Sequence, residues 1–130
     1  MRIYKFRGFH ADEHGKTVIK LDGKEIKGTW LYGDLHTDGP YINEHKVLPE
    51  TVGQYSGIPD IHGKEIFDGD ILSKFSNYAG KKIIKPVVFE LGIFFWKYSD
   101  SAAEPLYDVR DRAEIIGNIF ESPELVEVEE

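Results

Sequence analysis

The sequence has no cysteine among its 130 residues. Disulfide bonds, thiolate metal sites and cysteine nucleophiles are therefore excluded, and the composition suits a reducing cytoplasm. No apolar run approaches the roughly 18 residues that a membrane helix needs, so we expect no membrane partner. The opening residues MRIYKFRGF also lack the apolar stretch and cleavage site of a signal peptide. These absences predict a cytoplasmic protein.

The sequence is also poor in helical periodicity and in positive charge. No helical pattern of apolar residues lasts longer than about two turns, which argues against an all-α or α/β fold. Lysine and arginine number 16 against 23 aspartates and glutamates, giving a net charge of −7. A basic footprint over the whole chain, as expected for a nucleic-acid-binding domain, is absent. Nucleic acid therefore remains a partner that the net charge does not favour.

Apolar and turn-forming residues are plentiful. Hydrophobic residues make up 41% of the chain and aromatic residues 13%, so a core can form, and 13 glycines supply many turns. Alternation of apolar and polar residues predicts a hairpin over residues 2–21, strands at 29–35, 40–43, 70–75, 83–90, 93–98 and 113–121, and one short helical turn after Ser122-Pro123. We expect the 113–121 strand to be buried on both faces.

These elements predict a mainly β fold with little helix. We expect an N-terminal β-hairpin subdomain over residues 1–52 and a C-terminal β-barrel-like domain over 53–130, unless the two form one continuous domain. A small SH3-like barrel is one architecture that this order of strands permits, by analogy. Because Pro86 cannot donate a backbone hydrogen bond, we expect its strand to lie at an edge or a bulge.

The tetrapeptide GKEI occurs twice, at Gly23–Ile26 and Gly63–Ile66. Both copies follow a residue that leads into a tight turn, Asp22 before Gly23 and His62 before Gly63, and the spacing of the residues around them differs. We therefore interpret the echo as reused turn chemistry rather than an internal repeat. In this interpretation Gly63 and Gly69 occupy positive-φ or crowded positions.

The sharpest chemical pattern is HADEH, where His10, Glu13 and His14 match the H-x-x-E-H motif of zinc peptidases. That chemistry needs both histidines on one helical turn. Here the pentapeptide leaves a predicted strand and enters a turn, so the favoured interpretation is a turn with no metal. A second polar loop, with Asp34, His36 and Asp38, is interpreted in the same way.

Aromatic residues at two-residue spacing permit two interpretations. Tyr4 and Phe6 with Arg2 and Arg7, and Phe94, Trp96 and Tyr98 on one strand face, could stack nucleic-acid bases. The favoured interpretation is that these side chains belong to the core, because aromatic residues at this spacing usually do and the chain is acidic.

Several phrases of the sequence together resemble the YopX family of phage and prophage proteins. They are IYKFRGF at residues 3–9, PETVGQYSGIPDIHGKEIFDGDIL at Pro49–Leu72, VVFELGIFFW at Val87–Trp96 and AEIIGNIFESPEL at Ala113–Leu125. The resemblance covers nearly the whole chain and is weakest over His10–His45. It implies a small, mainly β protein that is encoded in a bacteriophage genome, acts in the host bacterium and self-associates. It supplies no catalytic residue and no cofactor.

The residues shared with the family are interpreted as a fold signature of turns. They are Gly53, Gln54, Tyr55, Gly57, Gly63, Gly69, Asp70, Gly117 and Asn118. No catalytic, cofactor-binding or metal-binding set is visible, so the predicted function is a non-catalytic interaction or assembly module. We expect a homo-oligomer, or a complex with a host or phage protein, with Phe94, Phe95 and Trp96 as the candidate interaction surface. The alternatives are a single-stranded nucleic-acid-binding accessory protein and an enzyme with an unrecognised site.

Overall fold

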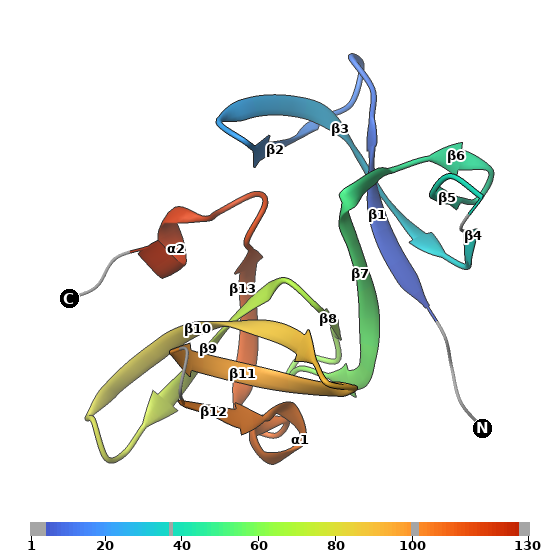
Figure 1. Cartoon of the computed structure of the whole chain (residues 1–130). Coiled ribbons are helices and arrows are strands. Elements are labelled where there is room, and N and C mark those ends of the chain that lie inside the picture. The colour runs from blue at the N-terminus through green and yellow to red at the C-terminus, as the bar shows by residue number, and fades with distance from the viewer. Residues whose placement is uncertain (1–4, 37, 100–101, 128–130) are drawn as a thin grey trace. The chain divides into compact units, whose positions relative to one another are not determined.

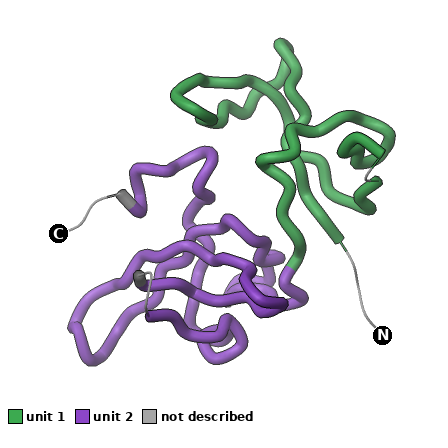
Figure 2. The backbone as a smooth tube through the Cα atoms, in the orientation of Figure 1, with its two compact units in different colours: residues 1–55 green, residues 56–130 purple. Residues whose placement is uncertain are grey.

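The structure is a computed structural model that describes residues 5–36, 38–99 and 102–127 (Figure 1). The chain divides into two compact units, residues 1–55 and residues 56–130, coloured separately in Figure 2. Strands dominate both units and the two helices have four residues each, so the predicted mainly β fold with little helix is confirmed. Neither of these helices has the length and apolar character needed to cross a membrane.

The regular elements in the described part of unit 1 are all strands. They are β1 (Phe6–Ala11), β2 (Thr17–Leu21), β3 (Lys24–Gly33), β4 (Leu35–His36), β5 (Tyr41–Ile42), β6 (His45–Lys46) and the first part of β7 (Leu48–Pro59). The strands β2-β3-β1-β7 belong to a five-stranded sheet whose last strand, β8 (Glu65–Phe67), follows β7 in the sheet order, and β4, β5 and β6 form a separate small sheet. The predicted Asp22-Gly23 turn is confirmed, since both residues have positive φ (52° and 78°) and Leu21 pairs with Lys24.

The expected hairpin of residues 2–21 is wrong. The antiparallel β3 lies between β2 and β1, pairing with β2 through Lys24–Gly28 and with β1 through Gly28–Gly33. A ten-residue strand is long enough to serve two partners in succession, and the alternation of apolar residues does not reveal this. The pairing places Phe9 opposite Trp30, with ring centroids 5.2 Å apart.

The core of unit 1 is small. Its fully or almost fully buried apolar residues are Phe9, Ile19, Ile42 and Val47. Thr51 links β1 to β7, because its hydroxyl accepts a hydrogen bond from the Phe9 amide (2.9 Å) and donates one to the Leu48 carbonyl (2.7 Å). A buried polar side chain that is satisfied in this way fixes the register of the two strands.

The turns expected after Gly53 are another correction. Residues 48–59 form β7, in which Gly53 pairs with Arg7 and Gln54 pairs with Phe6. The glycines of this segment are therefore strand residues, although Gly57 does have a positive φ of 84°. The domain boundary expected between residues 52 and 53 falls inside this strand.

Unit 2 contains the remaining elements. They are the end of β7, β8 (Glu65–Phe67), β9 (Asp70–Ser76), β10 (Lys81–Glu90), β11 (Ile93–Ser99), β12 (Ala102–Pro105), α1 (Leu106–Val109), β13 (Ala113–Asn118) and α2 (Glu124–Glu127). The main sheet has the order β12-β11-β10-β9-β13 and is curled like half of a barrel (Figure 1). The four-residue α2 confirms the helical turn predicted after Ser122-Pro123. The strands β8 and β12 and the helix α1 were not predicted from the sequence.

The core of unit 2 surrounds Trp96. It consists of Ile66, Leu72, Val87, Trp96, Leu106, Val109 and Ala113. The Trp96 side chain has no exposed area, and its indole N–H donates to the Lys85 carbonyl at 3.0 Å. The tryptophan therefore gains both apolar burial and a satisfied polar atom.

The expectation that the 113–121 strand is buried on both faces is wrong. β13 is an edge strand in the sheet order, and Ile116 is exposed where the register shifts between Ile115 and Gly117. The strand buried on both faces is β9, where residues 70–73 are all buried between β10 and β13. β10 lies inside the sheet order, but at Pro86 it pairs with β9 alone, as expected for an edge position, and its pairing with β11 begins at Val87. Pro86 lies where the pairing of β10 passes from β9 to β11, so its missing donor is tolerated at that junction.

Candidate interaction surfaces

Four signature residues meet where β9 and β13 begin and end. Asn118 pairs with Asp70, and Gly117 pairs with Ile71. The Asp70 carboxylate accepts a hydrogen bond from the Phe67 amide (2.8 Å), and the Ile119 amide donates to the Gly69 carbonyl (2.9 Å). Gly69 has a φ of 96°, as expected for a position that needs glycine. The cluster ties β8, β9 and β13 together through backbone groups.

Gly117 and Asn118 also fix the segment that leads to α2. A Cβ atom on Gly117 would lie only 3.2 Å from the Leu125 side chain and 3.3 Å from Ser122. The Asn118 amide oxygen accepts hydrogen bonds from the amides of Phe120 and Glu121, both at 2.9 Å. These contacts explain why Gly117 and Asn118 are needed for the backbone to adopt this conformation, and no ligand is required for that explanation.

The second GKEI copy is held by a residue outside the predicted signature, Asp60. Its buried carboxylate accepts hydrogen bonds from the amides of His62 (2.8 Å), Lys64 (2.9 Å) and Ile115 (3.0 Å). Burial alone would raise the pKa of Asp60. The three hydrogen bonds, with the charge of His62, outweigh burial and hold that pKa below its ordinary value. Gly63, at a φ of 84°, completes this loop.

Three signature residues of β7, namely Gly53, Gln54 and Tyr55, serve its pairing with β1 and with the residue that precedes β1. Beside the pairs made by Gly53 and Gln54, the Tyr55 amide donates to the Lys5 carbonyl at 2.7 Å. The Lys5 ammonium lies 5.9 Å from the centroid of the Tyr55 ring. These residues therefore act as strand positions, and they lie in a different unit from the cluster around Gly69.

The histidines of HADEH are held apart. His10 lies on β1, where its Nδ1 is 2.7 Å from the Lys46 carbonyl, while Glu13 and His14 stand exposed in the following turn. The expected strand-and-turn context is thus confirmed. Within the described ranges, no three histidine, aspartate or glutamate side chains lie close enough together to bind one metal ion.

The residues considered for base stacking differ in how far the structure buries them. Trp96 is fully buried, and Phe94 and Tyr98 pack against the same core, so the core interpretation holds for them. Arg7 is only 5% exposed and lies over the Trp30 ring at 4.9 Å. Arg2 and Tyr4 lie outside the described residues.

A polar group borders the core beside β12. The Tyr98 hydroxyl donates a short hydrogen bond to the Glu104 carboxylate, and the Lys74 ammonium lies 4.0 Å from that carboxylate and 5.6 Å from the Trp96 ring centroid. Burial and the hydrogen bond to Glu104 raise the pKa of Tyr98 to about 12. The hydroxyl therefore stays a donor at neutral pH, and the group joins β9, β11 and β12.

Unit 2 also has a shallow pocket of about 480 Å³. Its lining residues are Pro59, Asp60, Ile61, Arg110 and Asp111. The Arg110 guanidinium stacks on the Tyr107 ring at 3.7 Å, and Asp60 is already engaged by backbone amides. The pocket is therefore a surface depression lined by both apolar and charged residues, and its lining residues do not form a cluster of reactive groups.

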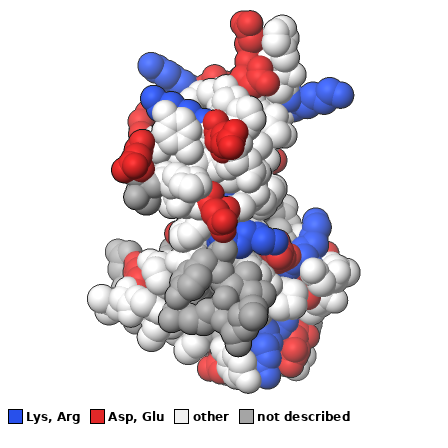
Figure 3. Space-filling model, turned by 90° about the vertical axis from the view of Figure 1, so that its right-hand side faces the viewer, with Lys and Arg blue, Asp and Glu red and all other residues white. Residues whose placement is uncertain are grey.

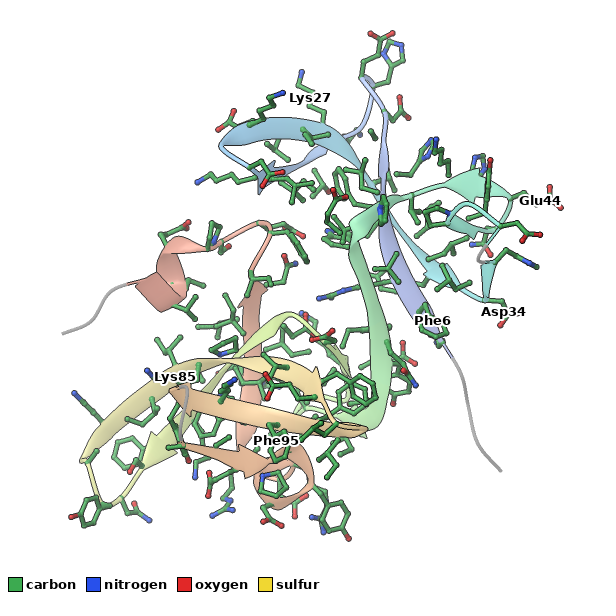
Figure 4. All side chains as sticks on the ribbon, in the orientation of Figure 1. Phe6, Lys27, Asp34, Glu44, Lys85 and Phe95 are labelled. Atoms are coloured by element: carbon green, nitrogen blue, oxygen red, sulfur yellow. The ribbon has the colours of Figure 1, made fainter. Side chains whose placement is uncertain are left out.

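The end of the β10–β11 hairpin exposes large apolar side chains. Phe89, Leu91 and Ile93 are 40%, 98% and 49% exposed, and Leu91 (φ 54°) and Gly92 (φ 80°) form the turn between the strands predicted at 83–90 and 93–98. Phe94 and Phe95 beside them are half-buried, and Figure 4 labels Phe95 on β11. Of the predicted interaction surface, Trp96 is a correction: its side chain turns into the core and contributes nothing to the surface.

The β9–β10 hairpin carries a second exposed surface, of different chemistry. Phe75 is 54% exposed and Tyr78, in the turn, is fully exposed, and Lys81 and Lys82 follow. By contrast, acidic and basic side chains are scattered among uncharged atoms on the face seen in Figure 3. The signal that could have revealed this hairpin is present in the sequence, because residues 71–89 contain no aspartate or glutamate.

The fold and these surfaces define a small β protein of two units. Its polar signature residues bind backbone groups, and its β9–β10 and β10–β11 hairpins carry exposed aromatic and aliphatic side chains. The chain belongs to the YopX family: the family model described as YopX protein matches residues 5–127. The chain is also similar to a solved structure, protein EF1440 from Enterococcus faecalis. The two share 26% identity at a TM-score of 0.53, over 98% of this chain and 100% of that one. None of the curated proteins matches the chain.

Proposed function

We propose that the protein is a non-catalytic interaction module that assembles with a second copy of itself, and that it acts in the cytoplasm of a bacterium carrying the phage or prophage that encodes it. The observation that supports this proposal is the apolar end of the β10–β11 hairpin. Phe89, Leu91 and Ile93 are exposed there within five residues of the chain, while Val87 and Trp96 of the same two strands are fully buried. Exposed apolar surface concentrated at one place is typical of a protein-binding site.

The surroundings of this hairpin end suit an interface. The centroids of the Phe89 and Phe94 rings are 4.5 Å apart, so the two rings form one continuous apolar surface. Beside it, the Lys97 ammonium donates to the Glu90 carboxylate at 2.9 Å. An apolar centre with a polar rim is the usual arrangement of a specific interface. Closed two-fold assembly is the commonest outcome when a chain binds its own copy.

The absence of catalysis in this proposal rests on how the buried polar side chains are used. Asp60, Asp70 and Asn118 each accept hydrogen bonds from backbone amides. A carboxylate that is saturated by backbone donors is a poor general base, because the same hydrogen bonds favour its charged form. We therefore assign these residues to folding.

The test is the mass of the protein in solution, measured by light scattering over a range of concentrations. We expect a mass above the 14.9 kDa of one chain, and a return to that mass in the variant Ile93→Asp. The matched control is Val18→Asp on β2, where the wild-type side chain is 41% exposed, and it should leave the assembly intact. A single-chain mass at every concentration, or equal effects of the two variants, would overturn the proposal.

A further inference from the structure

We propose that the outer part of the β9–β10 hairpin, residues 75–82, binds single-stranded nucleic acid. The first observation is a separation of charge along the chain. Residues 71–89 carry Lys74, Lys81, Lys82 and Lys85 and no acidic residue, in a chain whose net charge is −7. A local cationic element on an acidic protein binds an anion despite the repulsion of the whole, because salt screens distant charges within about 8 Å.

The charges of this hairpin are available to a ligand. Lys74, at the inner end, is paired with Glu104 and only 13% exposed. Lys81 and Lys82, further out, are exposed, and in the described part of the chain no carboxylate lies within 4.0 Å of their ammonium groups or of that of Lys85. By contrast Lys97, on the neighbouring hairpin, pairs with Glu90 at 2.9 Å.

The second observation is a pair of exposed rings beside these lysines. The Phe75 ring is 54% exposed and the Tyr78 ring is fully exposed, so neither contributes much to the core. Ser76 fixes the turn that carries Tyr78: its hydroxyl accepts from the Ala79 amide (3.0 Å) and its carbonyl accepts from the Gly80 amide (2.7 Å). The tip is therefore preorganised, and ordering it on binding costs little entropy.

The register of the hairpin places a lysine directly opposite an aromatic ring. Lys82 lies opposite Phe75, and Lys81 lies opposite Ser76. Flat rings next to ammonium groups match a single strand, where each base can stack on a ring while its phosphate meets a lysine. In a duplex the bases are already stacked and cannot reach the rings, which selects the single-stranded form. An acidic protein would use the lysines and leave the rings without partners.

The test is the fluorescence anisotropy of a labelled oligothymidine titrated with the protein at several salt concentrations. We expect binding at low salt that weakens as salt rises, with a log–log slope of about −0.7 for each phosphate contacted. Lys82→Gln should lower the affinity and make the slope shallower by about 0.7. Tyr78→Ala should lower the affinity with the slope unchanged, and Tyr78→Phe should restore it, because the ring acts by stacking.

Controls separate this site from the rest of the molecule. Lys16→Gln, an exposed lysine of unit 1, should bind like the wild type, and so should Ile93→Asp, which addresses only self-assembly. Circular dichroism checks that each variant is folded. The proposal is overturned if the oligonucleotide does not bind at low salt, or if the hairpin variants bind like the wild type. It is also overturned if polyglutamate or anionic phosphatidylglycerol vesicles bind as tightly as the oligonucleotide.

Discussion

Among single residues, Asp60 is a buried side chain that accepts hydrogen bonds from three backbone amides. We predict that Asp60→Ala lowers the free energy of unfolding by about 3 kcal/mol, because three amide donors lose a charged acceptor. Urea unfolding measures this loss. The control is Asp111→Ala, which removes an exposed carboxylate from the same pocket and should change stability by no more than about 0.5 kcal/mol.

The stabilisation by Asp60 should depend on pH. Its folded-state pKa is lowered from the ordinary 3.8, so its contribution is present above that value and is lost as pH falls through the lower folded pKa. The stability difference between the wild type and Asp60→Ala should thus be constant near neutral pH and shrink in strong acid. Repeating the comparison with His62→Gln in both proteins removes the one neighbouring charge that also lowers this pKa. A difference that grows on acidification would contradict the assignment.

Tyr98 makes the opposite prediction at high pH. Its pKa is raised to about 12 in the folded state from the ordinary 10.0, so its stabilising contribution is present below 10.0 and is lost as pH rises through 12. In an absorbance titration of the folded protein, Tyr98→Phe should remove the last phenolate step. Tyr78→Phe, which changes a side chain remote from Glu104, should keep that step.

At the scale of an element, the loop that carries the second GKEI copy depends on backbone conformation at Gly63. A Cβ atom there would meet nothing within 4 Å, and the φ of 84° alone disfavours other residues. We predict that Gly63→Ala costs about 1 kcal/mol of unfolding free energy, while Gly63→Asn costs less because asparagine tolerates left-handed φ. Urea unfolding of both variants measures the difference. Equal losses would show that φ is not the cause.

At the scale of the whole molecule, the two proposals have opposite salt dependence. Two copies of a chain with a net charge of −7 repel each other, so raising salt should favour self-assembly through the apolar hairpin end. Oligonucleotide binding through lysines should instead weaken between about 50 and about 200 mM salt. Light scattering and anisotropy on the same samples measure both. Loss of assembly as salt rises would contradict an apolar interface.

Much of the fold could be predicted wherever its cause is local. The turns at Asp22-Gly23 and Leu91-Gly92 follow from the glycine in each, which adopts positive φ without steric cost, and β9 follows from alternation within a few residues. The mainly β class, the short helical turn near the C-terminus and the YopX family likewise follow from composition and phrases in the sequence. These properties depend on neighbours in the chain, which the sequence displays directly.

Tertiary structure alone decided which strands are neighbours and which aromatic side chains are covered. β3 separates β1 from β2, and β9 rather than β13 lies between two strands, because pairing is chosen among segments far apart in the chain. The same packing buries Trp96 and exposes Tyr78, although both are aromatic residues in or beside predicted strands. Burial depends on which face of the curled sheet a side chain joins. The sequence by itself thus determined the class, the turns and the family, while contacts between distant segments determined the surfaces left for partners.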